Sequence, residues 1–73
     1  MKRVRVTWND HVSGSEWITK RKLRKMKPQK CVSEGLIFHQ DKEMVILINT
    51  RSCSEVGDYI LILKSCIKSI REI

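Results

Sequence analysis

The chain has 73 residues, 41% of them apolar, with 15 Lys and Arg against 8 Asp and Glu and a formal net charge of +7 at pH 7. For these 73 residues we expect one domain at most, with a small core, because a domain of this size buries only about 60% of the surface that its unfolded chain exposes. No apolar run approaches the roughly 20 residues that span a bilayer, and no apolar stretch of a signal peptide follows the basic start. We therefore expect one cytoplasmic domain, residues 1–73, with no membrane partner.

The first segment alternates between apolar and polar residues. In residues 3–8, RVRVTW, the side chains of Val4, Val6 and Trp8 share one face and polar side chains share the other. This pattern predicts a half-buried strand with a charged outer face. Residues 9–15, NDHVSGS, have the composition of a turn and end the strand.

The net charge of the whole chain lies in residues 20–30, which we call the basic segment. Its sequence, KRKLRKMKPQK, contains no acidic residue, and the eight basic residues elsewhere cancel the eight acidic ones. The seven cations are Lys20, Arg21, Lys22, Arg24, Lys25, Lys27 and Lys30. Just before it, Trp17 and Ile18 form an apolar pair that we expect to return to the core.

Two local structures are open for the basic segment. A short amphipathic helix from about Thr19, with Leu23 and Met26 on one face, would end before Pro28. The alternative is an irregular solvated loop, because like charges four residues apart on a helix repel one another.

The remainder of the chain is typical of short strands joined by turns. We expect strands over residues 31–39, 44–49 and 58–63, a hairpin turn over residues 40–43 and a loop over residues 50–57. Gly35 inside the first of these strands predicts a bend or bulge.

The C-terminal segment, residues 67–73, is ambiguous. Ile67, Ile70 and Ile73 are three residues apart, a spacing that favours a helical turn. The short strands and turn signals before it favour a final strand after a one-turn break at residues 64–66, and we predict the strand.

These elements predict an all-β fold: a small five-stranded SH3-like or Sm-like barrel, with a basic loop or short helix between strands 1 and 2. Curling into a barrel avoids the exposed edges of an open sheet. Both faces of residues 44–49 and 58–63 are apolar. One face would fill the barrel, and the other needs either a second subunit or the basic segment lying across it, so we expect a possible homo-oligomer.

Four stretches together resemble a family of small bacteriophage-encoded proteins of unknown function. They are V-R-V-T-W-N-D, W-I, C-V-S-E-G-L-I and Y-I-L-I-L-K-S-C-I-K-S-I. They are similar to a V-x-V-x-W-x-D start, a Ser-Gly-x-x-W loop, an S-x-G strand and an I-P-x-x-x-I ending. The chain departs from the family at Leu63-Lys64, where Ile-Pro is expected, and in its basic segment. The resemblance implies a phage or prophage origin, hence the cytoplasm of a bacterial host, and a small β fold, but no reaction.

The basic segment has two readings, phosphate contact and a solvated loop that keeps the protein soluble. Lysines and arginines that neutralise phosphates release counterions, and the absence of acidic residues favours an anionic partner. The segment has no interleaved aromatic residues, so binding there should be mostly independent of base sequence. Trp17, beside it, is a candidate anchor.

A second candidate site surrounds the first turn. Trp8, Asp10, His11 and Trp17 form a possible slot for a nucleotide base or a partner's side chain. The alternative is structural: Trp8 would be a core residue, which its alternation with Val4 and Val6 favours, and Trp17 would cover one end of the barrel.

Catalytic and metal chemistry have little support. Cys31, Cys53 and Cys66 are an odd number without the close spacing of a zinc site, which favours free thiols over ligands or disulfides. No Gly-rich phosphate loop is present, and nothing places a nucleophile beside His11 or His39. We therefore expect no enzyme activity, no metal and no cofactor.

The sequence thus predicts a non-enzymatic binding module for an anion, either a nucleic acid backbone or a nucleotide-like ligand. Its predicted binding residues are the seven cations of the basic segment and Trp17. The alternative function is a host-directed protein inhibitor, for example of a defence nuclease, that docks its basic segment on an acidic protein surface.

Overall fold

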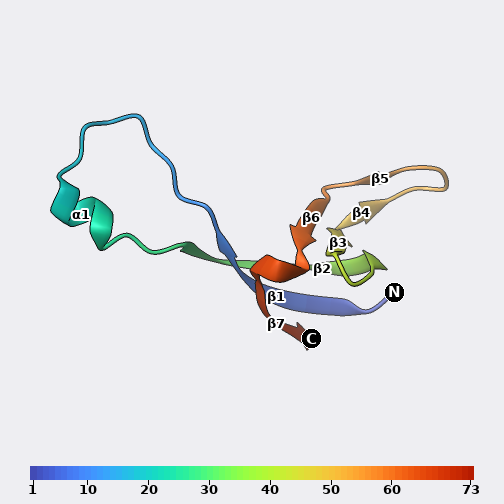
Figure 1. Ribbon diagram of the computed structural model, residues 1–73. Coiled ribbons are helices and arrows are strands. Elements are labelled where there is room, and N and C mark those ends of the chain that lie inside the picture. The colour runs from blue at the N-terminus through green and yellow to red at the C-terminus, as the bar shows by residue number, and fades with distance from the viewer.

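A five-stranded antiparallel sheet forms the body of the protein (Figure 1). The computed structural model describes residues 1–73. The strands follow the order β6-β3-β2-β1-β7, and β4 and β5 form a separate two-stranded sheet. The elements are β1 (Arg3–Asp10), α1 (Lys20–Arg24), β2 (Gln29–Gln40), β3 (Met44–Ile48), β4 (Thr50–Arg51), β5 (Val56–Gly57), β6 (Ile60–Leu63), the 3₁₀ helix η1 (Lys64–Cys66) and β7 (Ile67–Glu72). The all-β class is confirmed.

The core lies on one face of the sheet. Its fully buried cluster takes Val4 and Val6 from β1, Val45 and Leu47 from β3, and Ile62 from β6. The predicted alternation in β1 is therefore confirmed. Trp8 packs against this cluster, half-buried, and its Nε1 donates a hydrogen bond to Ser33 Oγ at 3.0 Å. The polar atom of the half-buried ring is therefore paired, as expected for a tryptophan that packs against a core.

Small residues in β2 face the core strand β1. Gly35 lies opposite Val4, and Ser33 lies opposite Val6. A Cβ on Gly35 would lie 3.0 Å from the Ile48 carbonyl oxygen and 3.2 Å from Leu47 Cβ. Gly35 therefore allows a close approach of β3. The bulge that we expected at this glycine is absent, because the β1–β2 register is continuous there; the irregularity falls between Ile37 and His39.

The segment predicted as a loop over residues 50–57 is a short hairpin of β4 and β5, so that prediction is wrong in part. Its turn is closed by Ser52. The Ser52 N–H donates to the Glu55 carbonyl at 2.8 Å, and Ser52 Oγ accepts from the Glu55 N–H at 3.1 Å. The serine hydroxyl takes the place of a backbone group in this turn. A search for alternating apolar residues does not detect a hairpin that is closed in this way.

The C-terminal segment is a strand, as predicted. Residues of β7 pair with β1, and Ile67 and Ile70 pack against the core cluster. The three residues of η1 lead directly from β6 into β7, although these two strands are opposite edges of the sheet. No ladder joins β6 to β7.

The turn between β2 and β3 is held by Asp41, within the predicted hairpin turn of residues 40–43. Its Oδ1 accepts hydrogen bonds from the N–H groups of Glu43 and Met44 at 2.8 and 2.9 Å, and its Oδ2 lies 2.8 Å from His39 Nε2. The contact with His39, followed by the two backbone N–H groups, lowers the pKa of Asp41 from 3.8 to about 2. The charged carboxylate is therefore the form that the turn prefers.

We expect Asp41 to give the protein a pH-dependent contribution to stability. Because the pKa of Asp41 is lower in the folded chain, this contribution is complete above the unfolded pKa of 3.8 and is lost as the pH falls toward about 2. The free energy of unfolding, measured in urea at about pH 5 and about pH 2, should fall more between these two pH values for the natural protein than for Asp41→Asn. Equal losses in the two proteins would contradict this role.

We also expect Gly35 to be intolerant of a side chain. Gly35→Ala should lower the free energy of unfolding by about 1–3 kcal/mol, because the added methyl group overpacks the contact with Ile48 and Leu47. Denaturant unfolding measures the change. The control is Gly14→Ala, where the nearest atom to an added Cβ lies 3.9 Å away, and it should leave stability nearly unchanged.

Candidate functional site

Residues 11–28, which we call the arm, project from the sheet between β1 and β2 (Figure 1). The β1–β2 ladder continues to its last pair, Asp10 and Gln29, and the arm begins where that ladder ends. Every residue of the arm is exposed. The molecule measures 51 × 22 × 21 Å along its principal axes, and the arm accounts for its elongated shape. The arm therefore contributes nothing to the buried core.

The helical alternative for the basic segment is confirmed, but α1 has only five residues. Thr19 is its N-cap, with Oγ1 accepting the Lys22 N–H at 3.2 Å, and Lys25 is its C-cap. Three physical factors keep it short. Like charges four residues apart repel, no acidic residue offsets the positive helix N-terminus, and Pro28 disfavours helical geometry at Lys27.

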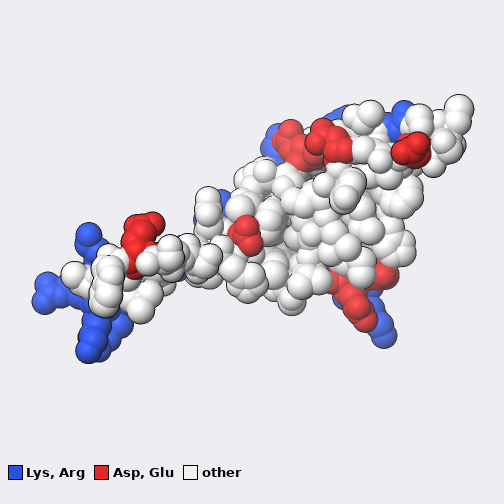
Figure 2. All heavy atoms as spheres, turned by 90° about the horizontal axis from the view of Figure 1, so that it is seen from above, with Lys and Arg blue, Asp and Glu red and all other residues white.

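The seven predicted cations lie on three local structures. Lys20, Arg21, Lys22 and Arg24 are on α1, Lys25 is its C-cap, Lys27 precedes Pro28, and Lys30 lies in β2 opposite Asn9. All seven are exposed. The chain has two ion pairs, Arg5 with Glu34 and His39 with Asp41, so no cation of the basic segment has an acidic partner. Figure 2 shows Lys and Arg gathered at the far end of the arm.

Trp17 and Ile18 do not return to the core, so that prediction is wrong. Trp17 is fully exposed, and Ile18 is exposed as well. Trp17 therefore does not cover one end of the sheet either. The reason is geometric: these residues follow the end of the ladder on an arm that leads away from the body, and strand residues already fill the core. Trp17 shares the arm with the cations.

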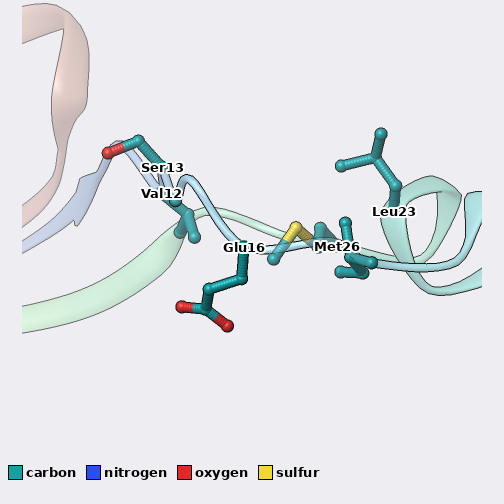
Figure 3. A pocket seen from close by; sticks show the side chains of 7 residues that line it. Val12, Ser13, Glu16, Leu23 and Met26 are labelled. Carbon is teal, nitrogen blue, oxygen red and sulfur yellow. The ribbon is translucent and has the colours of Figure 1, made fainter.

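Apolar side chains of the arm line a hollow of about 340 Å³ (Figure 3). Val12 and Ile18 come from the outgoing part of the arm, and Leu23 and Met26 come from α1 and the residues after it. Glu16 also lines the hollow and is the only acidic residue of the arm. The spacing of Leu23 and Met26 indicated one apolar face, but the sequence did not reveal which residues lie opposite it.

The predicted slot around the first turn is only partly formed. Trp8, Asp10 and His11 line a second cavity, of about 230 Å³, together with Leu61, Ile62, Leu63 and Cys66. Trp17 is not among these residues, because the arm carries it elsewhere. The sequence missed the contribution of β6 and η1, since those residues are about fifty positions away along the chain.

The three cysteines are free thiols. Cys31 and Cys66 are half-buried, and Cys53 is exposed. The structure brings together no group of three or more His, Cys, Asp or Glu side chains that could hold a metal ion. Neither helix is long and apolar enough to cross a membrane.

The arm should be the first part of the native protein that a protease cuts. Because all of its backbone is exposed and unpaired with the sheet, brief trypsin digestion should cleave after cations between Lys20 and Lys25 while the strands remain intact. Mass spectrometry of the fragments locates the cuts. First cleavage after Arg5 or Lys68, which lie in paired strands, would contradict this arrangement.

Comparison with known proteins gives no match: no protein-family model, no curated protein and no solved structure is similar to this chain. The function proposed below therefore rests on the residues of this chain alone.

Proposed function

We propose that the protein is a non-enzymatic binding module that grips the phosphate backbone of nucleic acid with its arm. One observation carries the proposal: seven exposed cations without an acidic partner are concentrated on and beside a projecting arm. Such a concentrated positive field attracts polyanions, and each cation that meets a phosphate releases condensed counterions.

The geometry supports backbone contact more than recognition of bases. The five-residue helix α1 carries cations on several sides. Cations that point in several directions can contact phosphates of a backbone without a fixed alignment to the bases. The fully exposed Trp17 indole is available to stack on one unpaired base, and it is the only aromatic residue of the arm. We therefore propose binding with little sequence preference and a steep dependence on salt.

The proposed fold is an SH3-like or Sm-like barrel. The meander from β1 through β2 and β3 to β6, the one-turn connection through η1 and the return of β7 to β1 support it. The core cluster also joins strands that are not neighbours in the sheet, as a strongly curved sheet requires. The resemblance of the sequence to small phage proteins supports a phage origin and action in the cytoplasm of the bacterial host.

A second candidate function is a host-directed inhibitor that docks the arm on an acidic protein surface. The apolar hollow favours the inhibitor, because the exposed side chains of Leu23 and Met26 cannot contribute to binding phosphates. An apolar hollow on the same arm as a cluster of cations suits contact with an acidic protein groove that also offers apolar side chains. The target in this case would be a host enzyme such as a defence nuclease.

Titration with random single- and double-stranded DNA and RNA at several salt concentrations tests the first proposal. If all seven cations contact phosphates of duplex DNA, the logarithm of the binding constant should fall with the logarithm of salt with a slope of about −6. Replacing Arg21, Arg24 and Lys25 with Glu should weaken binding at least tenfold at low salt and reduce that slope by about 3.

The matched control replaces Lys2, Lys42 and Lys68 with Glu. These residues are exposed outside the arm, and the control changes the net charge by the same amount. It should affect binding much less. Equal losses in the two triple variants, or no effect of the arm variant, would overturn the nucleic-acid proposal. Specific capture of a host protein that Leu23→Glu abolishes would then favour the inhibitor.

A further inference from the structure

Strand β6 is an open edge of the main sheet. It pairs with β3 on one side only, with Val45 opposite Ile62 and Ile46 opposite Leu61. None of the side-chain hydrogen bonds, and none of the backbone hydrogen bonds outside the regular ladders, involves residues 60–63. The backbone groups on the far side of β6 therefore have no partner within the chain.

The register shows which groups these are. The Lys64 N–H donates to the Glu43 carbonyl at 2.8 Å, one step beyond the pair of Leu63 with Met44. In an antiparallel ladder, hydrogen-bonded pairs alternate with pairs that are not hydrogen-bonded. Ile60 and Ile62 therefore direct their N–H and C=O groups toward β3. Leu61 and Leu63 direct theirs toward the open edge.

The two edges of the sheet differ in how they are protected. Charged residues on an edge strand discourage pairing with another chain. Strand β7 carries Lys68, Arg71 and Glu72, whereas β6 consists of four aliphatic residues with no charge and no proline. Leu61 and Leu63 line the cavity beside Trp8, yet they remain 50% and 51% exposed, so about half of each side chain is uncovered next to the open backbone edge.

We propose that β6 is a self-association edge, on which β6 of a second copy of this chain adds antiparallel, around a two-fold axis at Ile62. This register places Leu61 of each copy opposite Leu63 of the other. The N–H and C=O groups of these residues point to the open edge, so each of the two pairs forms two hydrogen bonds. The exposed leucines cover one another, and the two sheets become one. The interface is isologous, as expected for a homodimer.

The charges of the chain fit this occupant. Because the pairing is antiparallel, Lys64 of each copy lies opposite Ile60 of the other, so the two lysines are at opposite ends of the interface. A nucleic acid has no cation to meet within β6, and the charged edge β7 is a poorer match for four aliphatic residues. The proposal does not depend on the function of the arm.

Sedimentation equilibrium of the full chain, over a roughly hundredfold range of concentration, tests the proposal. We expect a monomer–dimer equilibrium, and a strict monomer at every concentration would overturn it. Leu61→Pro deletes an N–H that points to the open edge, so the β3–β6 ladder survives while the dimer loses hydrogen bonds. We expect at least tenfold weaker association and an unchanged circular dichroism spectrum.

A second variant covers the case in which the proline disturbs folding. Leu61→Glu places like charges in the interface and should also abolish dimerisation. Its control is Val32→Glu, at an exposed position of β2, which lies inside the sheet, and this variant should still dimerise. Dimers that persist in Leu61→Glu, or that are lost equally in Val32→Glu, would refute an interface at β6.

Amide hydrogen exchange tests the register. Amides of Leu61 and Leu63 should exchange quickly in dilute protein and slow down as the dimer forms, while those of Ile60 and Ile62 are protected throughout. Protection that instead rises in β7 would show that β6 meets β7 of a second copy, and would overturn the two-fold arrangement.

Discussion

The close approach of β1 and β3 across the central strand β2 is the constraint on which the rest of the structure depends. These two strands are separated by β2 in the sheet, yet Val4 and Val6 meet Val45 and Leu47 in one buried cluster. The residues of β2 opposite Val4 and Val6 are Gly35 and Ser33, which are too small to keep the strands apart. With only seven buried residues in the chain, loss of this contact would leave little else to hold the sheet.

Because the small core is built from strand residues alone, the arm does not contribute to the stability of the fold. The side chains that stabilise the fold come from the strands, and the last pair of the β1–β2 ladder marks the point beyond which no residue is buried. A segment that does not pack against the core tolerates like charges that would destabilise a packed helix or strand. It can hold seven like charges and a fully exposed tryptophan because neither is required to pack. Binding surfaces are often carried on loops that a rigid sheet positions.

The unequal edges of the sheet have a related origin. Strand β7 begins directly after η1 and uses Ile67 and Ile70 for the core, so its other positions are free to carry charge. Strand β6 is only four residues long and is aliphatic on both faces. One face supplies Ile62 to the core, and the other leaves Leu61 and Leu63 about half exposed. If β6 dimerises as proposed, each assembly carries two arms, which would increase avidity for a long polyanion.

Local patterns in the sequence were sufficient for the strands and for the position of the charge. Alternation predicted β1, a continuous apolar run predicted β3, and the C-terminal strand was favoured over a helix because its neighbours were strands. The counts of Lys, Arg, Asp and Glu placed the net charge in residues 20–30. Each of these depends on residues that are close together along the chain, where the periodicity of a strand or the absence of an acidic residue is directly visible.

Only the tertiary structure decided where Trp17 and Ile18 lie, which residues join Trp8 around its cavity, and which two strands form the edges of the sheet. The apolar side chains of Trp17 and Ile18 favour burial, but the β1–β2 ladder ends at Asp10 and leaves both residues on the arm. Gly35 has the same sequence signature for a bulge as for a close approach, and the choice depends on β3, which follows it in the chain. Burial and pairing are set by residues far apart in sequence, so no local pattern contains them.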